Sequence, residues 1–236
     1  MKYRSKGGTT ALKIKNMFFK EIFSDRKFLI TGGALFLSLL LFIFFPSTDR
    51  LSGGIQSAII FTVFFLIFPL LYAKFILGES WQRMGFRMDG GLSHWLGMFG
   101  AVAVGFALFF LGYQVWPALQ EAYQLPFSVE RSFFSFVRYE LFAFGVAFFY
   151  EVFFRGFVMF LFFRPFGRWA ILLQWGVFLL FLTASQSFGM GQAGMILFAP
   201  LAGWIAYRSQ SILYSFIGSA LFLFLIDTFL LFHNLR

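Results

Sequence analysis

Long apolar stretches dominate this chain and restrict it to one class of fold. Of the 236 residues, 60% are hydrophobic and only 12% are charged, whereas a soluble domain averages about 25% charged residues. Several apolar runs reach about 20 residues, the length at which a helix crosses the hydrocarbon core of a bilayer. The alternating segments of about ten residues that build a membrane β-barrel are absent from the sequence. The sequence therefore predicts an all-α, polytopic helical membrane protein.

We expect about seven transmembrane helices in a single domain over residues 28–236. A basic cytoplasmic segment, residues 1–27, precedes them. Apolar residues in it recur on one helical face, which suits an amphipathic helix at the membrane surface, and a short solvated tail is the alternative. The spans are expected at 28–45, 55–77, 94–116, 133–162, 169–186, 190–207 and 211–232.

The distribution of Lys and Arg predicts the orientation, because cytoplasmic flanks carry an excess of these residues. With residues 1–27 inside, the cytoplasmic flanks hold fourteen cations, and the opposite side holds Arg50, Arg131 and Arg236. We therefore expect a cytoplasmic N-terminus, in the inner membrane of a bacterium. Topology and contact with anionic lipid account for most of the net charge of +9, so no nucleic-acid surface is expected. Membrane lipids and another transmembrane protein or complex are the expected partners.

Two opposite charges lie inside the fourth expected span. Glu151 and Arg155 are four residues apart within a run of Phe and Val, so they share one helix face. Glu140, eleven residues earlier, returns to that face. A charge at this depth costs several kcal/mol, of the order of 3. The pair is either a structural ion pair or a site in which the carboxylate acts as a general base on water.

The last span carries a second polar stripe. Ser211, Ser215 and Ser219 recur every four residues, and Asp227 follows eight residues after the last of them. Small polar side chains let helices approach closely and bond across the interface, so helix packing is the favoured interpretation of the serines. Asp227 is expected either to meet a cation from another helix or chain, or to have a functional role.

The sequence offers few residues for metal binding and none for thiol chemistry. The chain has no cysteine, which excludes disulfides and zinc sites built on sulfur. His94 and His233 fall at opposite faces of the membrane, and zinc usually requires three or four protein ligands. No metal and no cofactor are therefore expected. Pro200 is expected to kink the sixth span, and the carbonyl that it frees either lines a cavity or bonds to a neighbour.

Three short motifs occur in an order that one known family shares. They are Tyr150-Glu151-Val-Phe-Phe-Arg155-Gly156, the segment from Gln82 to Arg87, and the turn from Gly203 to Ile212. Over residues 75–230 the chain resembles the CPBP family of intramembrane proteases, also called the Abi or CAAX-prenyl-protease type. That family has Glu-Glu-x-x-x-Arg-Gly on one helix, Phe-x-x-x-His on the next and His-x-x-x-Asn or Asp on the last.

The chain departs from the family pattern at its catalytic positions. Tyr150 replaces the first glutamate of the pair. The histidine of the second motif falls on Ser185, or on Gln186 after a shift of one residue. The histidine of the third motif falls on Ser219, and its Asn or Asp partner falls on Leu223. The resemblance thus implies the fold of an intramembrane endopeptidase that lacks both motif histidines.

Three functional hypotheses follow. The leading one is a catalytically inactive protein that serves as a binding or scaffold subunit, in which Glu151 and Arg155 are vestigial or structural. The first alternative is an active protease with Glu151 as general base, and with Ser185, Gln186 or Ser219 holding water or the oxyanion. The second alternative is a small transporter, although the sequence shows no repeated half.

Overall fold

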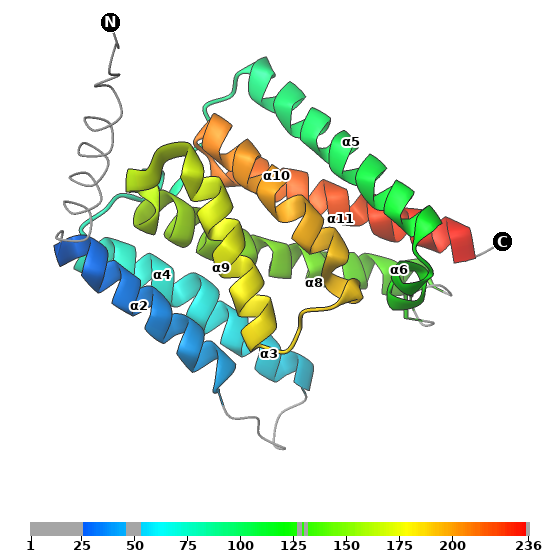
Figure 1. The fold of residues 1–236 in the computed structure, drawn as a ribbon, viewed down its shortest axis with the longest axis horizontal. Helices are drawn as coiled ribbons and strands as arrows, with labels where there is room; N and C mark the ends of the chain where they lie inside the picture. Colours follow the sequence, from blue (N-terminus) through cyan, green and yellow to red (C-terminus); the bar gives the residue numbers. More distant parts are fainter. Residues whose placement is uncertain (1–25, 46–52, 127–128, 130–131, 235–236) are drawn as a thin grey trace, which may run out of the picture.

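The chain folds into a bundle of long helices (Figure 1). We describe a computed structural model, which covers residues 26–45, 53–126, 129 and 132–234. These residues contain no strand, and seven of their helices are long and apolar enough to cross a membrane. The prediction of an all-α, polytopic helical protein is confirmed. The expected amphipathic segment, 1–27, lies almost entirely outside the described residues.

The seven spans agree with the expected ones to within a few residues, except that the fifth begins five residues earlier, at Arg164. Several spans combine helical types. The elements in chain order are α2 (Arg26–Ile43), α3 (Gly53–Phe61), η1 (Thr62–Ile67), α4 (Phe68–Leu71), η2 (Tyr72–Ile76), η3 (Trp81–Met84), α5 (Leu92–Val115), α6 (Pro117–Ala122), α8 (Phe133–Tyr150), η4 (Glu151–Phe162), η5 (Arg164–Trp169), α9 (Ala170–Ala184), η6 (Met190–Gln192), α10 (Ala193–Ser209) and α11 (Ile212–Asn234).

Two apolar cores hold the bundle together. The first surrounds η4, whose residues from Glu151 to Phe160 are all buried, and includes Phe65 stacked on Phe153 with ring centroids 4.4 Å apart. The second joins α5, α10 and α11, which lie side by side in Figure 1. Many large apolar side chains remain on the outside of the spans, as lipid contact requires, because a soluble monomer rarely exposes such extensive apolar patches.

The fourth span changes helical type at Glu151. Residues up to Tyr150 form the α-helix α8, and those from Glu151 onward form the wider π-helix η4. At its end the Phe163 N–H donates to the Val158 carbonyl, five residues back, at 2.8 Å. The sequence prediction used α-helical spacing throughout this span. Short π-helical turns often mark functional positions, and here the change occurs at the candidate glutamate.

Helix α10 continues through Pro200 from Ala193 to Ser209. Because proline has no N–H, the carbonyl four residues earlier, at Ile196, loses its helical donor. The Trp175 indole of α9 donates to that carbonyl at 3.1 Å. Of the two outcomes that the sequence left open for the freed carbonyl, the bond to a neighbour is confirmed.

Replacing Trp175 by Phe is expected to lower the free energy of unfolding by about 1–3 kcal/mol, because the Ile196 carbonyl is left without a donor. Replacing Pro200 by Ala restores the N–H of residue 200, so the same Trp175→Phe change should cost less in that background. Thermal unfolding of the four proteins in detergent measures the difference. Equal losses in both backgrounds would mean that the indole contributes packing alone.

Candidate functional site

Glu151 lies where the fourth span packs against α9, α10 and α11, and only 1% of its surface is exposed. Ser219 of α11 donates its hydroxyl to Oε1 of the carboxylate at 2.7 Å. Ser215, one turn earlier on α11, donates to Oε2. The spacing of four residues places both serines on the face of α11 that packs against the fourth span. Each oxygen of the carboxylate therefore accepts a hydrogen bond.

Arg155 lies one turn beyond Glu151 and is 5% exposed. Its Nε is 3.6 Å from Glu151 Oε2, and one terminal nitrogen donates to the Ala199 carbonyl of α10 at 3.2 Å. Gln174 of α9 donates to the same carbonyl at 3.3 Å. The predicted contact between the glutamate and the arginine is thus present. Together these bonds connect η4 to α9, α10 and α11.

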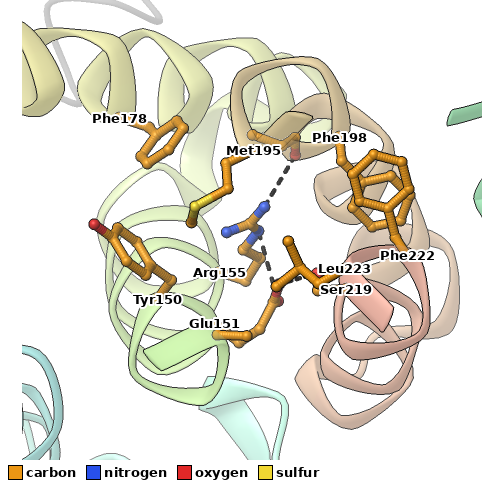
Figure 2. Close-up of a pocket in the computed structure, with 11 residues that line it drawn as sticks. Tyr150, Glu151, Arg155, Phe178, Met195, Phe198, Ser219, Phe222 and Leu223 are labelled. Carbon is orange, nitrogen blue, oxygen red and sulfur yellow. Dashed lines mark hydrogen bonds and ion pairs between the residues drawn. The ribbon is translucent and has the colours of Figure 1, made fainter. Parts of the chain in front are cut away.

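A small cavity of about 30 Å³ adjoins the pair (Figure 2). One water requires roughly 10–15 Å³ by this measure, so the cavity has room for one or two waters and not for a peptide. Figure 2 shows the side chains converging on Arg155 from three sides. Besides the ion pair, the lining consists of Ser219 and mostly apolar side chains: Ala147, Tyr150, Phe178, Met195, Phe198, Ala199, Phe222 and Leu223.

The residues singled out by the family motifs separate into two groups. Tyr150, Ser219 and Leu223 line the cavity beside Glu151. Ser185 and Gln186 do not line it: they end α9, where the Ser185 hydroxyl donates to the Leu182 carbonyl at 3.3 Å. Gln186 follows with a φ of 55° and its side chain is exposed. The structure therefore brings the first and third motif positions together and leaves the second apart.

Two site residues were not recognised from the sequence. Ser215 was interpreted as a packing residue, although it bonds to Glu151. Gln174 was not considered, yet it is fully buried and shares an acceptor with Arg155. An amide inside an otherwise apolar span is a usable signal, since polar residues at this depth are rare and usually face the bundle interior.

Glu140 and Asp227 form a second polar site. Glu140 lies on α8, eleven residues before Glu151 and so about 16 Å away along a helix that rises 1.5 Å per residue. Asp227 lies on α11, eight residues after Ser219. Both are buried, and their carboxyl groups are close enough to interact directly.

The described part of the chain brings no three His, Cys, Asp or Glu side chains together as metal ligands. The His94 ring packs against Tyr214. The His233 ring packs against Tyr113 and Phe229. The two imidazoles thus sit among aromatic side chains, away from Glu151, and a zinc site usually requires three or four protein ligands.

Comparisons of the chain with protein-family models, with curated proteins and with solved structures return no match.

Proposed function

We propose that this chain is a catalytically inactive membrane protein, related in fold to the CPBP-type proteases, that serves as a binding or scaffold subunit for a membrane partner. One observation carries the proposal: both oxygens of Glu151 accept hydroxyl hydrogen bonds, and Arg155 offsets its charge. A general base needs a free lone pair directed at the water that it activates, and the two serines already occupy two of the roughly four lone-pair positions of this carboxylate. Here the carboxylate ties the fourth span to α11, and its partner Arg155 ties the same span to α10.

The size of the cavity supports the same conclusion. About 30 Å³ beside Glu151 accommodates water but not the amide of a substrate. Ser185 and Gln186, the positions that correspond to the second motif histidine, do not line it. The alternative is a protease that uses Glu151 as base, and the observation in its favour is that Ser219 and room for a water lie next to the carboxylate.

Cleavage in native membranes separates these functions. Cells carry the wild-type protein, Glu151→Gln or Glu151→Ala, and the control is Glu121→Gln, which removes an exposed carboxylate on α6. New peptide N-termini are counted by mass spectrometry, and abundance and co-purifying membrane proteins are measured in parallel. We expect the same set of peptide N-termini with wild type and with both Glu151 variants. Partner recovery should follow abundance, which falls in both Glu151 variants because each leaves the buried Arg155 guanidinium without its counter-charge.

The inactive-protein proposal is overturned if, for the same amount of membrane protein, new N-termini appear with wild type and with the Glu121→Gln control but not with Glu151→Gln. Such a result would assign the role of base to Glu151. A partner that is recovered in the same amount per molecule of wild type and of Glu151→Gln supports a binding role that needs the fold and not the charge of the carboxylate.

Membrane lipid is the second partner that we propose, at a polar cavity of about 320 Å³ lined by Arg83, Arg87 and Arg164. Clustered arginines at one end of a bundle attract anionic headgroups. Arg87 also donates to the Gln210 carbonyl at 2.9 Å, which ties the cavity wall to the end of α10. The excess of cations at this end supports placing it, with the N-terminus, on the cytoplasmic side of a bacterial inner membrane.

A further inference from the structure

The pair formed by Glu140 and Asp227 has no counter-charge in the structure. Glu140 is 4% exposed and Asp227 is 8% exposed. Within the described ranges, no Lys, Arg or His forms an ion pair with either, and no donor reaches either oxygen of Glu140. Two adjacent buried carboxylates without a compensating group are strongly unfavourable. Such a pair is stable only when a proton or a cation from outside these helices neutralises its charge.

A cavity gives access to Asp227, the member of the pair that lines it. It measures about 380 Å³ and is lined by Asp227, Tyr123, Tyr139 and Gln192, among others. This volume lies within the range of about 300–1,000 Å³ that is usual for small-molecule sites. Phe142 contributes to the wall and is 56% exposed, so the cavity reaches the outer surface of α8. A ligand can therefore approach Asp227 from outside the bundle.

The lining suits an organic cation. The rest of the wall is largely apolar, including Val146, Leu223 and Ile226, which matches an alkyl chain. The Tyr123 and Tyr139 rings offer faces that attract cations. A divalent metal is a poorer fit, because the described residues supply no third acidic or imidazole ligand.

Tyr123 is held in place as a neutral phenol. Burial raises the pKa of Tyr123 to about 12, and the nearby charge of Asp227 adds to this effect. The Gly194 N–H donates to the phenol oxygen at 2.6 Å, which fixes the ring at the start of α10. The tyrosine thus contributes a positioned aromatic face and no competing charge.

We propose that Asp227, with the Glu140 carboxyl group beside it, binds an ammonium or guanidinium group that enters through this cavity. The group comes either from a free alkylamine or from a Lys or Arg side chain on a partner transmembrane segment. The second possibility, a Lys or Arg side chain of a partner, rests on the proposed binding function. It specifies that the partner carries a cationic side chain within its transmembrane segment. It also answers the question that the sequence left open for Asp227: no described helix supplies its cation.

Binding to the full-length protein in nanodiscs of zwitterionic lipid tests the site. The free probe is n-hexylammonium, with n-hexanol as its neutral counterpart. The membrane probe is a synthetic Leu/Ala transmembrane peptide that carries one Lys, compared with the same peptide carrying Leu. Asp227→Asn and Glu140→Gln keep the shape of the side chains and remove a charge. Glu121→Gln, which removes an exposed carboxylate on α6 outside the cavity, is the control.

We expect at least one of the two cationic probes to bind, with affinity at least tenfold lower in Asp227→Asn and in Glu140→Gln, and unchanged in Glu121→Gln. Both substitutions remove an uncompensated buried charge, so the variants should fold at least as well as wild type, which thermal unfolding verifies. Binding of hexylammonium identifies a free cation as sufficient. Binding of the Lys peptide alone identifies a partner helix.

Any one of three results overturns the site: neither cation binds, each cation binds no better than its neutral counterpart, or the affinity is unchanged in Asp227→Asn and Glu140→Gln. These outcomes are independent of the cleavage experiment. If no cation binds and no cleavage depends on Glu151, the cation site is refuted and the scaffold role is retained. A site that binds in a protein that also cleaves would refute the scaffold role and retain the cation site.

Discussion

Replacing Arg155 by Met is expected to lower the free energy of unfolding by about 3–5 kcal/mol, because it leaves the buried Glu151 carboxylate without its cation. The serine hydroxyls that donate to Glu151 remain, but they carry no charge. The substitution also removes one of the two donors to the Ala199 carbonyl, where Gln174 remains. Unfolding of the full chain in mixed detergent and denaturant, followed by tryptophan fluorescence, measures the loss.

A double-mutant cycle assigns the loss to the pair. Glu151→Gln alone leaves the guanidinium of Arg155 buried without a counter-charge, so a similar loss is expected. Combining Glu151→Gln with Arg155→Met removes both charges, and the double variant should be closer to wild type than the sum of the single losses. Arg138→Met is the matched control, since this arginine is exposed on the same span, and it should change stability by less than about 0.5 kcal/mol.

Strict additivity of the two single losses would contradict this account. It would mean that Arg155 contributes through packing and its bond to the Ala199 carbonyl and not through the Glu151 carboxylate. The cycle also bears on function. A structural role for Glu151 requires that the pair be strongly coupled in stability. If Glu151 were instead a catalytic base, loss of Arg155 should reduce cleavage more than it reduces stability.

The sequence predicted the features that depend on local chain chemistry. The seven spans follow from apolar length alone, and the contact between Glu151 and Arg155 follows from helical spacing. The resemblance to the CPBP family also implied that Ser219 lies near Glu151, and its hydroxyl is 2.7 Å from the carboxylate. Each of these predictions needs only the sequence of one helix or the order of the motifs. None of them needs to know how the helices pack.

Features that depend on the packing of separate helices were not predictable. Glu140 and Asp227 were each noticed, but their contact exists only because α8 packs against α11. The π-helix that begins at Glu151 was not predictable either, since nothing in a run of Phe and Val distinguishes it from an α-helix. Ser215 had a sufficient explanation in helix packing, and only its distance from the carboxylate revealed a second role.

Replacing Gly85 by Ala is expected to lower the free energy of unfolding by about 2–5 kcal/mol. Gly85 has a φ of +87°, and a left-handed conformation costs a residue with a side chain about 1–2 kcal/mol. A Cβ at this position would lie 2.6 Å from a ring carbon of Phe160 and 3.0 Å from the backbone nitrogen of Ile212. Overpacking of this kind adds about 1–3 kcal/mol.

The clash has no inexpensive relief, because Gly85 is fixed from both sides. Its carbonyl accepts from the Ile212 N–H at 3.0 Å, and the next turn of the chain is tied to α11 by the Ser211 hydroxyl, which donates to the Arg87 carbonyl. Moving the backbone away from Phe160 would therefore break the contact between this turn and the start of α11. The serines that hold Glu151 lie on the first turns of that same helix.

Gly78 provides the matched control for this substitution. Its φ is +66°, and no atom lies within 4 Å of the position of an added Cβ, so Gly78→Ala carries the conformational cost without the clash. Under the unfolding conditions used for Arg155, Gly85→Ala should lose more stability than Gly78→Ala by about 1–3 kcal/mol. Equal losses would show that the turn moves freely, and α11 would then need another anchor to keep Ser215 and Ser219 within reach of Glu151.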